Sequence, residues 1–68
     1  MERTPEKYRS ELRQERAKRL LALAVDTRSE AEYWEWAEEP SIALSLRVTS
    51  LRLEVLAGRL LGVLRAPN

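Results

Sequence analysis

Residues 42–63 read IALSLRVTSLRLEVLAGRLLGV, and the periodicity of this stretch decides the fold class of a 68-residue chain. Taken as a helix, the stretch places residues at alternating intervals of four and three, the spacing of a coiled-coil seam with one polar member. The seam residues are Ile42, Leu46, Thr49, Leu53, Leu56, Leu60 and Val63. This heptad pattern predicts a helix that packs lengthwise against another helix.

A second row of residues runs along another side of the same predicted helix. The row consists of Leu44, Val48, Leu51, Val55, Gly58 and Gly62. A helix with two apolar rows needs two neighbours, and the chain offers only one other long helix. We therefore expect the second row to form the interface between copies of the chain, with the two glycines inside the helix and able to permit close packing.

The same stretch also fits a β-strand pattern. Apolar residues alternate with small or polar ones over residues 42–48 and again over 51–55. The junction between them, Thr49-Ser50, lacks the glycine or asparagine of a two-residue hairpin turn, and leucine dominates the apolar set. These two facts favour the helix, and the strand pair stays as the alternative.

A first helix is expected over residues 5–25. Pro5 suits the first helical position, and strong helix formers follow it. The second half of this helix, from Leu20 to Val25, is apolar nearly all round, whereas the first half is highly charged. We expect the second half to be buried and the first half to project into solvent or onto a partner.

A short second helix is expected over residues 29–38. Thr27 and Ser29 each precede a glutamate by three positions, which is the spacing of a capping box at a helix start. Pro40 limits this helix, and the third helix follows over residues 41–65. The predicted fold is therefore all-α, with two long helices and one short intervening helix in a single small domain over residues 1–68.

Composition excludes several classes of function. The chain has no cysteine and no histidine, which removes disulfides, thiol nucleophiles, imidazole acid–base chemistry and the usual zinc ligands. The glutamates of residues 30–39 have no apolar surroundings and no histidine beside them, so they indicate a solvated acidic face. No glycine-rich phosphate loop is present. We expect no catalytic residue, no metal, no cofactor and hence no enzyme.

Length and charge indicate how the chain is stabilised and where it resides. A chain this short buries only about 60% of the surface that its unfolded form exposes, so its core is thin. Since disulfides and a zinc site are excluded, we expect homo-oligomerisation to supply the additional stability. Four charged side chains within residues 42–64 make a membrane span unfavourable, at roughly 2.5–3.5 kcal/mol each near a helix centre. A charged N-terminus lacks the core of a signal peptide, so we expect a cytoplasmic protein.

The net charge of +1 is unevenly distributed along the chain. Residues 26–39 carry six acidic side chains and one basic one, whereas the flanking segments are both basic. We expect oppositely charged segments to lie side by side in the folded protein or its oligomer. Alternatively, one of these surfaces meets a charged partner.

Two groups of residues are candidates for binding a partner. Trp34 and Trp36 point about 200° apart on a helix, so one of them packs against the core while the other is available to an interface. The other group is a basic stripe of Arg9, Arg13 and Arg16 on the first helix. The leading hypothesis is a self-associating helical module that binds a protein partner, and the alternative is a nucleic-acid-binding regulator that uses the basic stripe.

Overall fold

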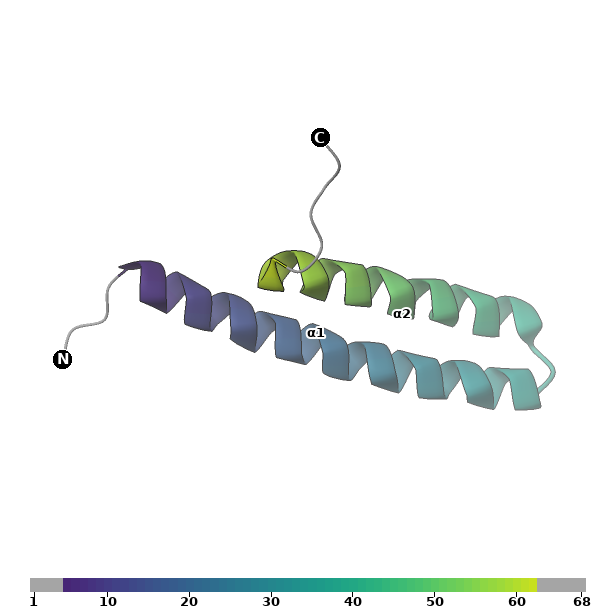
Figure 1. Ribbon diagram of the computed structural model, residues 1–68. Helices are drawn as coiled ribbons and strands as arrows, with labels where there is room; N and C mark the ends of the chain where they lie inside the picture. The colour runs from purple at the N-terminus through teal and green to yellow at the C-terminus, as the bar shows by residue number, and fades with distance from the viewer. Residues whose placement is uncertain (1–4, 63–68) are drawn as a thin grey trace, which may run out of the picture.

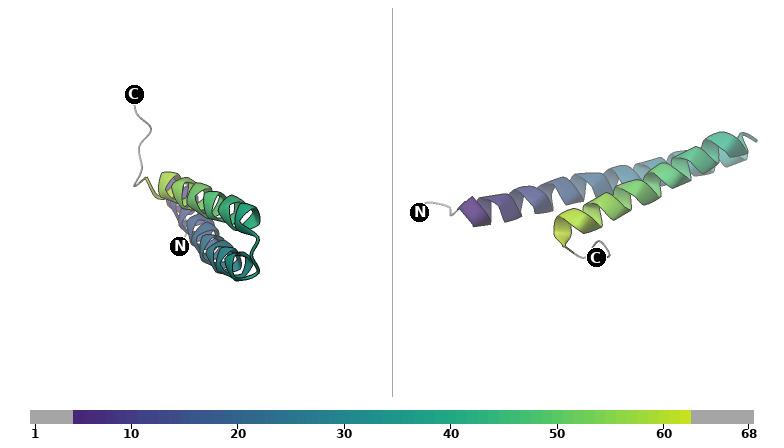
Figure 2. Two further views of the ribbon diagram at one scale, coloured as in Figure 1. Left: turned by 90° about the vertical axis from the view of Figure 1, so that its right-hand side faces the viewer. Right: turned by 90° about the horizontal axis from the view of Figure 1, so that it is seen from above.

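The computed structural model describes residues 5–62, which form a hairpin of two antiparallel α-helices (Figure 1). Helix α1 spans Pro5–Trp36, and α2 spans Pro40–Leu61. The helices run side by side in all views, and the N-terminal part of α1 extends beyond the end of α2 (Figures 1 and 2). No strand occurs among the described residues, so the all-α prediction is confirmed and the strand alternative is wrong.

The predicted break near residues 26–29 is wrong, because α1 continues through it as one helix of 32 residues. The Thr27 hydroxyl donates a hydrogen bond of 2.7 Å to the carbonyl of Leu23, one turn earlier. A threonine hydroxyl can bond backward to a carbonyl within a helix or forward to a free amide at a helix start, and here it bonds backward. The predicted short helix over 29–38 is therefore the C-terminal part of α1.

The turn between the helices is a Schellman motif built on a non-glycine residue. The amide of Glu39 donates to the Trp34 carbonyl at 2.8 Å, and the amide of Glu38 donates to the Glu35 carbonyl at 3.1 Å. Glu38 adopts the left-handed conformation, with φ of 62°. Pro40 then occupies the start of α2, where its missing amide leaves no hydrogen bond unmade. Pro40 thus separates the helices, as the sequence predicts.

Gly62 ends α2. This residue is in the left-handed conformation, with φ of 74° and ψ of 13°, and its amide donates to the Arg59 carbonyl at 3.1 Å. Glycine has no Cβ to oppose that conformation. The prediction that Gly62 lies inside the helix is wrong, since α2 ends at Leu61, and the predicted helical residues 63–65 lie outside the described residues. Val63 of the predicted seam lies outside the described residues.

The contact between the helices is a seam of small residues spaced seven apart on each helix. The buried residues of the described chain are Ala17, Ala24, Ala31, Ala43, Ser50 and Ala57. The Ser50 hydroxyl donates a 2.9 Å hydrogen bond across the seam to the carbonyl of Ala24. Because that side chain extends only one atom beyond Cβ, the bond requires the two backbones to lie very close together. We call these six residues the small-residue seam.

The predicted seam on α2 is displaced from the observed contact by about one position. Three of its members, Ile42, Thr49 and Leu56, are exposed. The other three described members flank the small-residue seam and are partly buried, namely Leu46, Leu53 and Leu60. Small side chains at the centre let the helix backbones approach and gain dispersion contacts along their whole shared length. The structure therefore favours alanine and serine over the larger residues at the point of closest contact.

Enlarging one residue of the small-residue seam should destabilise the hairpin. We expect Ala24→Leu to lower the free energy of unfolding by about 1–3 kcal/mol, because the added atoms force the close backbones apart. Ala22→Leu is the matched control, since Ala22 is exposed on the same helix and leucine is a strong helix former. Urea unfolding followed by circular dichroism, at one fixed protein concentration, measures both. Equal stability of the two variants would contradict the observed contact.

Relieving the backbone strain at Glu38 should stabilise the hairpin. We expect Glu38→Gly to raise the free energy of unfolding by roughly 0.5–1 kcal/mol, because glycine adopts a positive φ without steric cost. Glu38→Gln controls for the charge that glycine also removes, and it keeps the strained conformation. Thermal unfolding of both variants tests the motif, and a gain with glutamine as large as that with glycine would assign the effect to charge alone.

Candidate interaction surface

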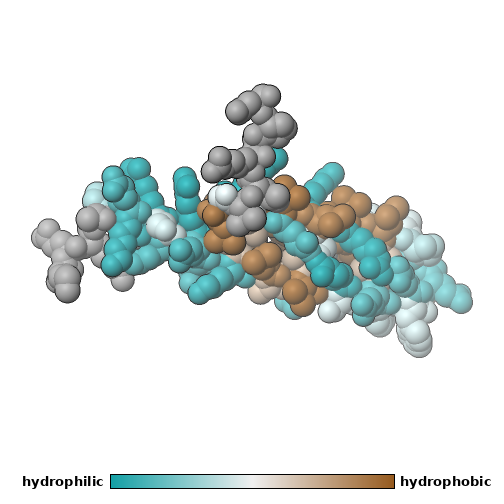
Figure 3. Space-filling model, in the orientation of Figure 1, coloured by the Kyte–Doolittle hydropathy of each residue, from teal (hydrophilic) through white to brown (hydrophobic). Residues whose placement is uncertain are grey.

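One side of the hairpin carries an open apolar groove formed by both helices. Leu21 and Val25 of α1 and Leu51 and Val55 of α2 line it, and its volume is about 590 Å³. Gly58, which has no side chain, also lines the groove. Apolar residues of both helices gather where the helices run together, whereas the N-terminal extension is hydrophilic (Figure 3). We call this side of the hairpin the groove face.

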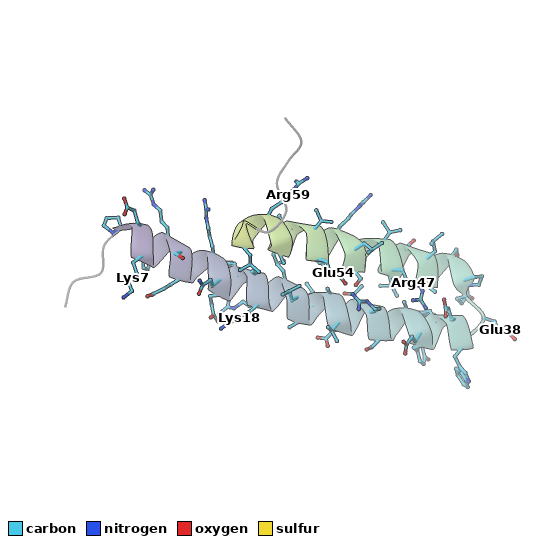
Figure 4. All side chains as sticks on the ribbon, in the orientation of Figure 1. Lys7, Lys18, Glu38, Arg47, Glu54 and Arg59 are labelled. Atoms are coloured by element: carbon cyan, nitrogen blue, oxygen red, sulfur yellow. The ribbon has the colours of Figure 1, made fainter. Side chains whose placement is uncertain are left out.

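Two ion pairs join the helices along the groove face. Arg28 pairs with Glu54, and both residues also line the groove. Seven residues closer to the turn on each helix, the Arg47 Nη2 lies 2.8 Å from Oε1 of Glu35, to which Nε also donates at 3.1 Å. Figure 4 shows Arg47 and Glu54 projecting from α2 toward α1. Because the four side chains are 36–53% exposed, each pair contributes at most about 1 kcal/mol and mainly fixes the register.

The structure brings the large residues of the predicted interface together on the exposed side of α2. Leu44, Val48, Leu51 and Val55 are 63%, 39%, 61% and 41% exposed. Helix α1 therefore leaves this row uncovered. Gly58 continues the row into the groove, whereas Gly62 caps the helix instead of lying within it. The predicted interface residues form one continuous surface within the described residues of α2.

Helix α1 adds residues to the groove face that the sequence analysis placed in the core. Leu21 and Val25 are 41% and 58% exposed, and Leu23 on another side of α1 is 51% exposed. The prediction that the second half of the first helix is buried is wrong, because the small-residue seam takes the contact with α2. The heptad spacing of Ala17, Ala24 and Ala31 is the feature of the sequence that indicates where α1 contacts α2.

The aromatic residues lie at the turn end of α1. Trp36 is 81% exposed, whereas Trp34 is partly buried. Tyr33 contacts both indoles, edge-to-face with Trp34 at 5.3 Å between ring centroids and tilted against Trp36 at 6.4 Å. The sequence prediction that the two tryptophans occupy different environments is confirmed. Trp36 has the exposure that an interface anchor requires before it binds.

The basic stripe of Arg9, Arg13 and Arg16 is exposed near the free end of α1. The antiparallel register, fixed by the bond between Ser50 and Ala24, sets Gly62 level with about residue 12 of α1. Arg9 therefore lies on the part of α1 that extends beyond α2, as the sequence analysis expected for the first half of this helix. Glu15 and other acidic residues interrupt the stripe, so the surface is mixed rather than uniformly basic.

The two ends of the hairpin differ in charge. The turn end carries glutamates, which we call the acidic end: Glu30, Glu32, Glu35, Glu38 and Glu39. The open end carries an excess of cations, which we call the basic end: Arg13, Arg16, Lys18, Arg19 and Arg59. Within residues 5–62, Glu35 is the one glutamate of the acidic end that pairs with a cation of the other helix, so the folded chain keeps the two ends electrically distinct.

Comparisons with known proteins give no relative from which the role of this surface could be inferred. No family model matches the chain, and neither curated proteins nor solved structures give a match. Over residues 5–62, no helix has the length and hydropathy needed to cross a membrane. The same residues contain no group of three or more acidic, cysteine or histidine side chains arranged to hold a metal ion.

The unequal exposure of the two tryptophans should be visible in solution. We expect Trp34→Phe, which keeps only Trp36, to show strong fluorescence quenching by acrylamide, because Trp36 is 81% exposed. Trp36→Phe, which keeps only Trp34, should be quenched less. Both variants unfolded in urea supply the reference for full exposure. Equal quenching of the two folded variants would contradict the arrangement of the turn end.

Proposed function

We propose that this chain is a small non-catalytic assembly module that self-associates through the groove face, with α2 as its main contact, and presents the N-terminal part of α1 or the exposed Trp36 to a protein partner. The observation that carries the proposal is the contrast between the buried and the exposed apolar residues. Among residues 5–62 the buried side chains are five alanines and one serine, while Leu44, Leu51 and Val25 are each more than half exposed. The side chains with the most to gain from burial are thus the ones that the hairpin leaves in water.

The energetics favour a second layer of helices over the groove face. Burying one alanine methyl group contributes about 0.8 kcal/mol, whereas burying a leucine or valine contributes roughly 1.5–3 kcal/mol. Soluble monomers rarely leave contiguous apolar patches larger than a few hundred Å² uncovered. Two hairpins stacked on their groove faces would complete a four-helix bundle, a stable solution for helices that have one uncovered apolar side.

The surface also supports association by its shape. Gly58 lines the groove without a side chain, and the exposed leucines Leu44 and Leu51 project from the same helix. Knobs that enter hollows of a facing helix are the packing mode of helical bundles. The ion pair between Arg28 and Glu54 lines the groove, so a second layer of helices would cover the two charges as a pair and leave neither of them without its partner.

A second candidate function rests on the extension of α1 beyond α2. Arg9 lies on this extension, and Arg13 and Arg16 follow in the next helical turn of α1. All three are exposed and could neutralise phosphates of a nucleic acid. Binding to generic duplex and single-stranded nucleic acid, measured at two salt concentrations, separates the candidates. Steeply salt-dependent binding that is lost on reversing the three arginine charges would favour the nucleic-acid function. Absence of binding at low salt would remove it.

A charge placed on the exposed row of α2, which is Leu44, Val48, Leu51 and Val55, should dissociate the assembly. We expect the native chain to sediment as an oligomer at micromolar concentration, and Val48→Glu and Leu51→Glu each to sediment as monomers with reduced helix content, because a buried unpaired carboxylate is costly. Ser45→Glu is the control, since Ser45 is exposed on α2 and belongs to neither apolar row. Analytical ultracentrifugation and circular dichroism supply the readings.

A native chain that sediments as a monomer with a normal cooperative melt would overturn the proposed self-association. Dissociation by Ser45→Glu with no effect of Val48→Glu and Leu51→Glu would keep self-association and move it to another side of α2.

A further inference from the structure

Two rows of residues seven apart define the groove face, one on each helix. The row on α2 is Leu44, Leu51 and Gly58, and the row on α1 is Lys18, Val25 and Glu32. Residues seven apart in a helix lie on the same side, two turns from one another. The middle residues of the two rows, Val25 and Leu51, line the same groove. Each row thus extends equally toward the turn and toward the open end.

The α2 row fits an antiparallel copy of itself in shape. Leu44 and Leu51 are 63% and 61% exposed, so both project from the surface, whereas Gly58 has no side chain and lines the hollow. When a second α2 lies antiparallel with Leu51 facing Leu51, each Leu44 faces a Gly58. A protruding side chain then meets a hollow at both ends of the row, which is the self-complementarity that a twofold interface requires.

The charges of the α1 row are complementary to those of an antiparallel copy of the same row. Lys18 and Glu32 are exposed on either side of Val25. When a second α1 lies antiparallel with Val25 facing Val25, each Lys18 faces a Glu32. If the second hairpin instead placed its turn end beside the turn end of the first, the acidic end of one copy would lie against the acidic end of the other. Like-charge juxtaposition opposes that orientation.

One twofold axis satisfies both rows. The bond between Ser50 and Ala24 sets these two residues level in the hairpin, and Leu51 and Val25 each follow by one position. Side chains in a helix lean toward its N-terminus, so in antiparallel helices the side chains of Leu51 and Val25 lean back to a common level. A twofold axis that lies in the interface and runs from Val25 to Leu51, across both helices, therefore passes through the middle of both rows.

We propose that the groove face binds a second copy of this chain, antiparallel to the first and related by a twofold axis that crosses at Val25 and Leu51. This arrangement rests on the proposed self-association and adds its orientation and register. Leu44 fills the hollow at Gly58 of the second copy, and the acidic end of each copy lies against the basic end of the other. The unequal charges that the folded monomer leaves separated are thereby paired.

Single cysteines test the arrangement, because the chain has none of its own. We expect Leu51→Cys, at the axis, to form a disulfide-linked dimer under mild oxidation, since a disulfide needs Cα atoms within about 7 Å. Leu44→Cys alone should not cross-link, because the two copies of residue 44 lie about 21 Å apart at 1.5 Å per residue. A mixture of Leu44→Cys and Gly58→Cys chains should give the mixed cross-link. Each variant is first shown by sedimentation under reducing conditions to remain dimeric.

The outcomes separate the two proposals. A monomeric native chain overturns both of them. A dimeric chain in which Leu44→Cys cross-links to itself, or in which Leu51→Cys does not, overturns the antiparallel register and leaves self-association standing. Cross-linking through Leu51→Cys and through the mixture of Leu44→Cys and Gly58→Cys supports the register.

A charge swap gives an independent reading without cysteines. We expect Lys18→Glu and Glu32→Lys each to weaken dimerisation roughly threefold to tenfold, because each places two like-charged pairs across the interface. The double variant Lys18→Glu/Glu32→Lys should return the dissociation constant to within about twofold of the native value. Failure of the double variant to recover, with both single variants folded by circular dichroism, would overturn the pairing of these residues.

Discussion

The structure depends on the close contact between α1 and α2 that the small-residue seam permits. The Ser50 hydroxyl reaches the carbonyl of Ala24 on the other helix, which is possible only when the two backbones are nearly in contact. This contact sets the antiparallel register, and two ion pairs one heptad apart, Arg28 with Glu54 and Arg47 with Glu35, join the helices on one side of it. The register in turn decides which residues of each helix share a side of the hairpin.

The same contact explains why the larger apolar side chains lie outside. A seam of alanine and serine occupies the line between the helices, so leucines and valines are displaced to its two sides. On one side they form the groove face, and on the other Leu46, Leu53 and Leu60 are only partly buried. A hairpin built this way has a narrow core and broad apolar flanks, and this contrast is the observation on which the proposed self-association rests.

The fold class, the placement of Pro40 between two helices and the exposed row of α2 could be predicted from sequence, because heptad spacing and proline act locally. The continuity of α1 through Thr27 could not, since a threonine hydroxyl can bond backward or forward and only the contact of Ala24 and Ala31 with α2 requires one continuous helix. The seam was misplaced for a related reason. Hydrophobic periodicity gives weight to large residues such as Ile42 and Leu56, whereas the closest approach of two backbones selects small ones.

The most direct test of the account is to measure which methyl groups of the two helices are in contact within one chain. Nuclear Overhauser effects filtered for intramolecular contacts, in a sample that mixes labelled and unlabelled chains, give this reading. The register predicts effects between the methyl groups of Ala17 and Ala57 and between those of Ala31 and Ala43. Absence of both pairs, together with effects from Ile42 and Leu56 to methyl groups of α1, would show that larger residues form the contact and would contradict the account.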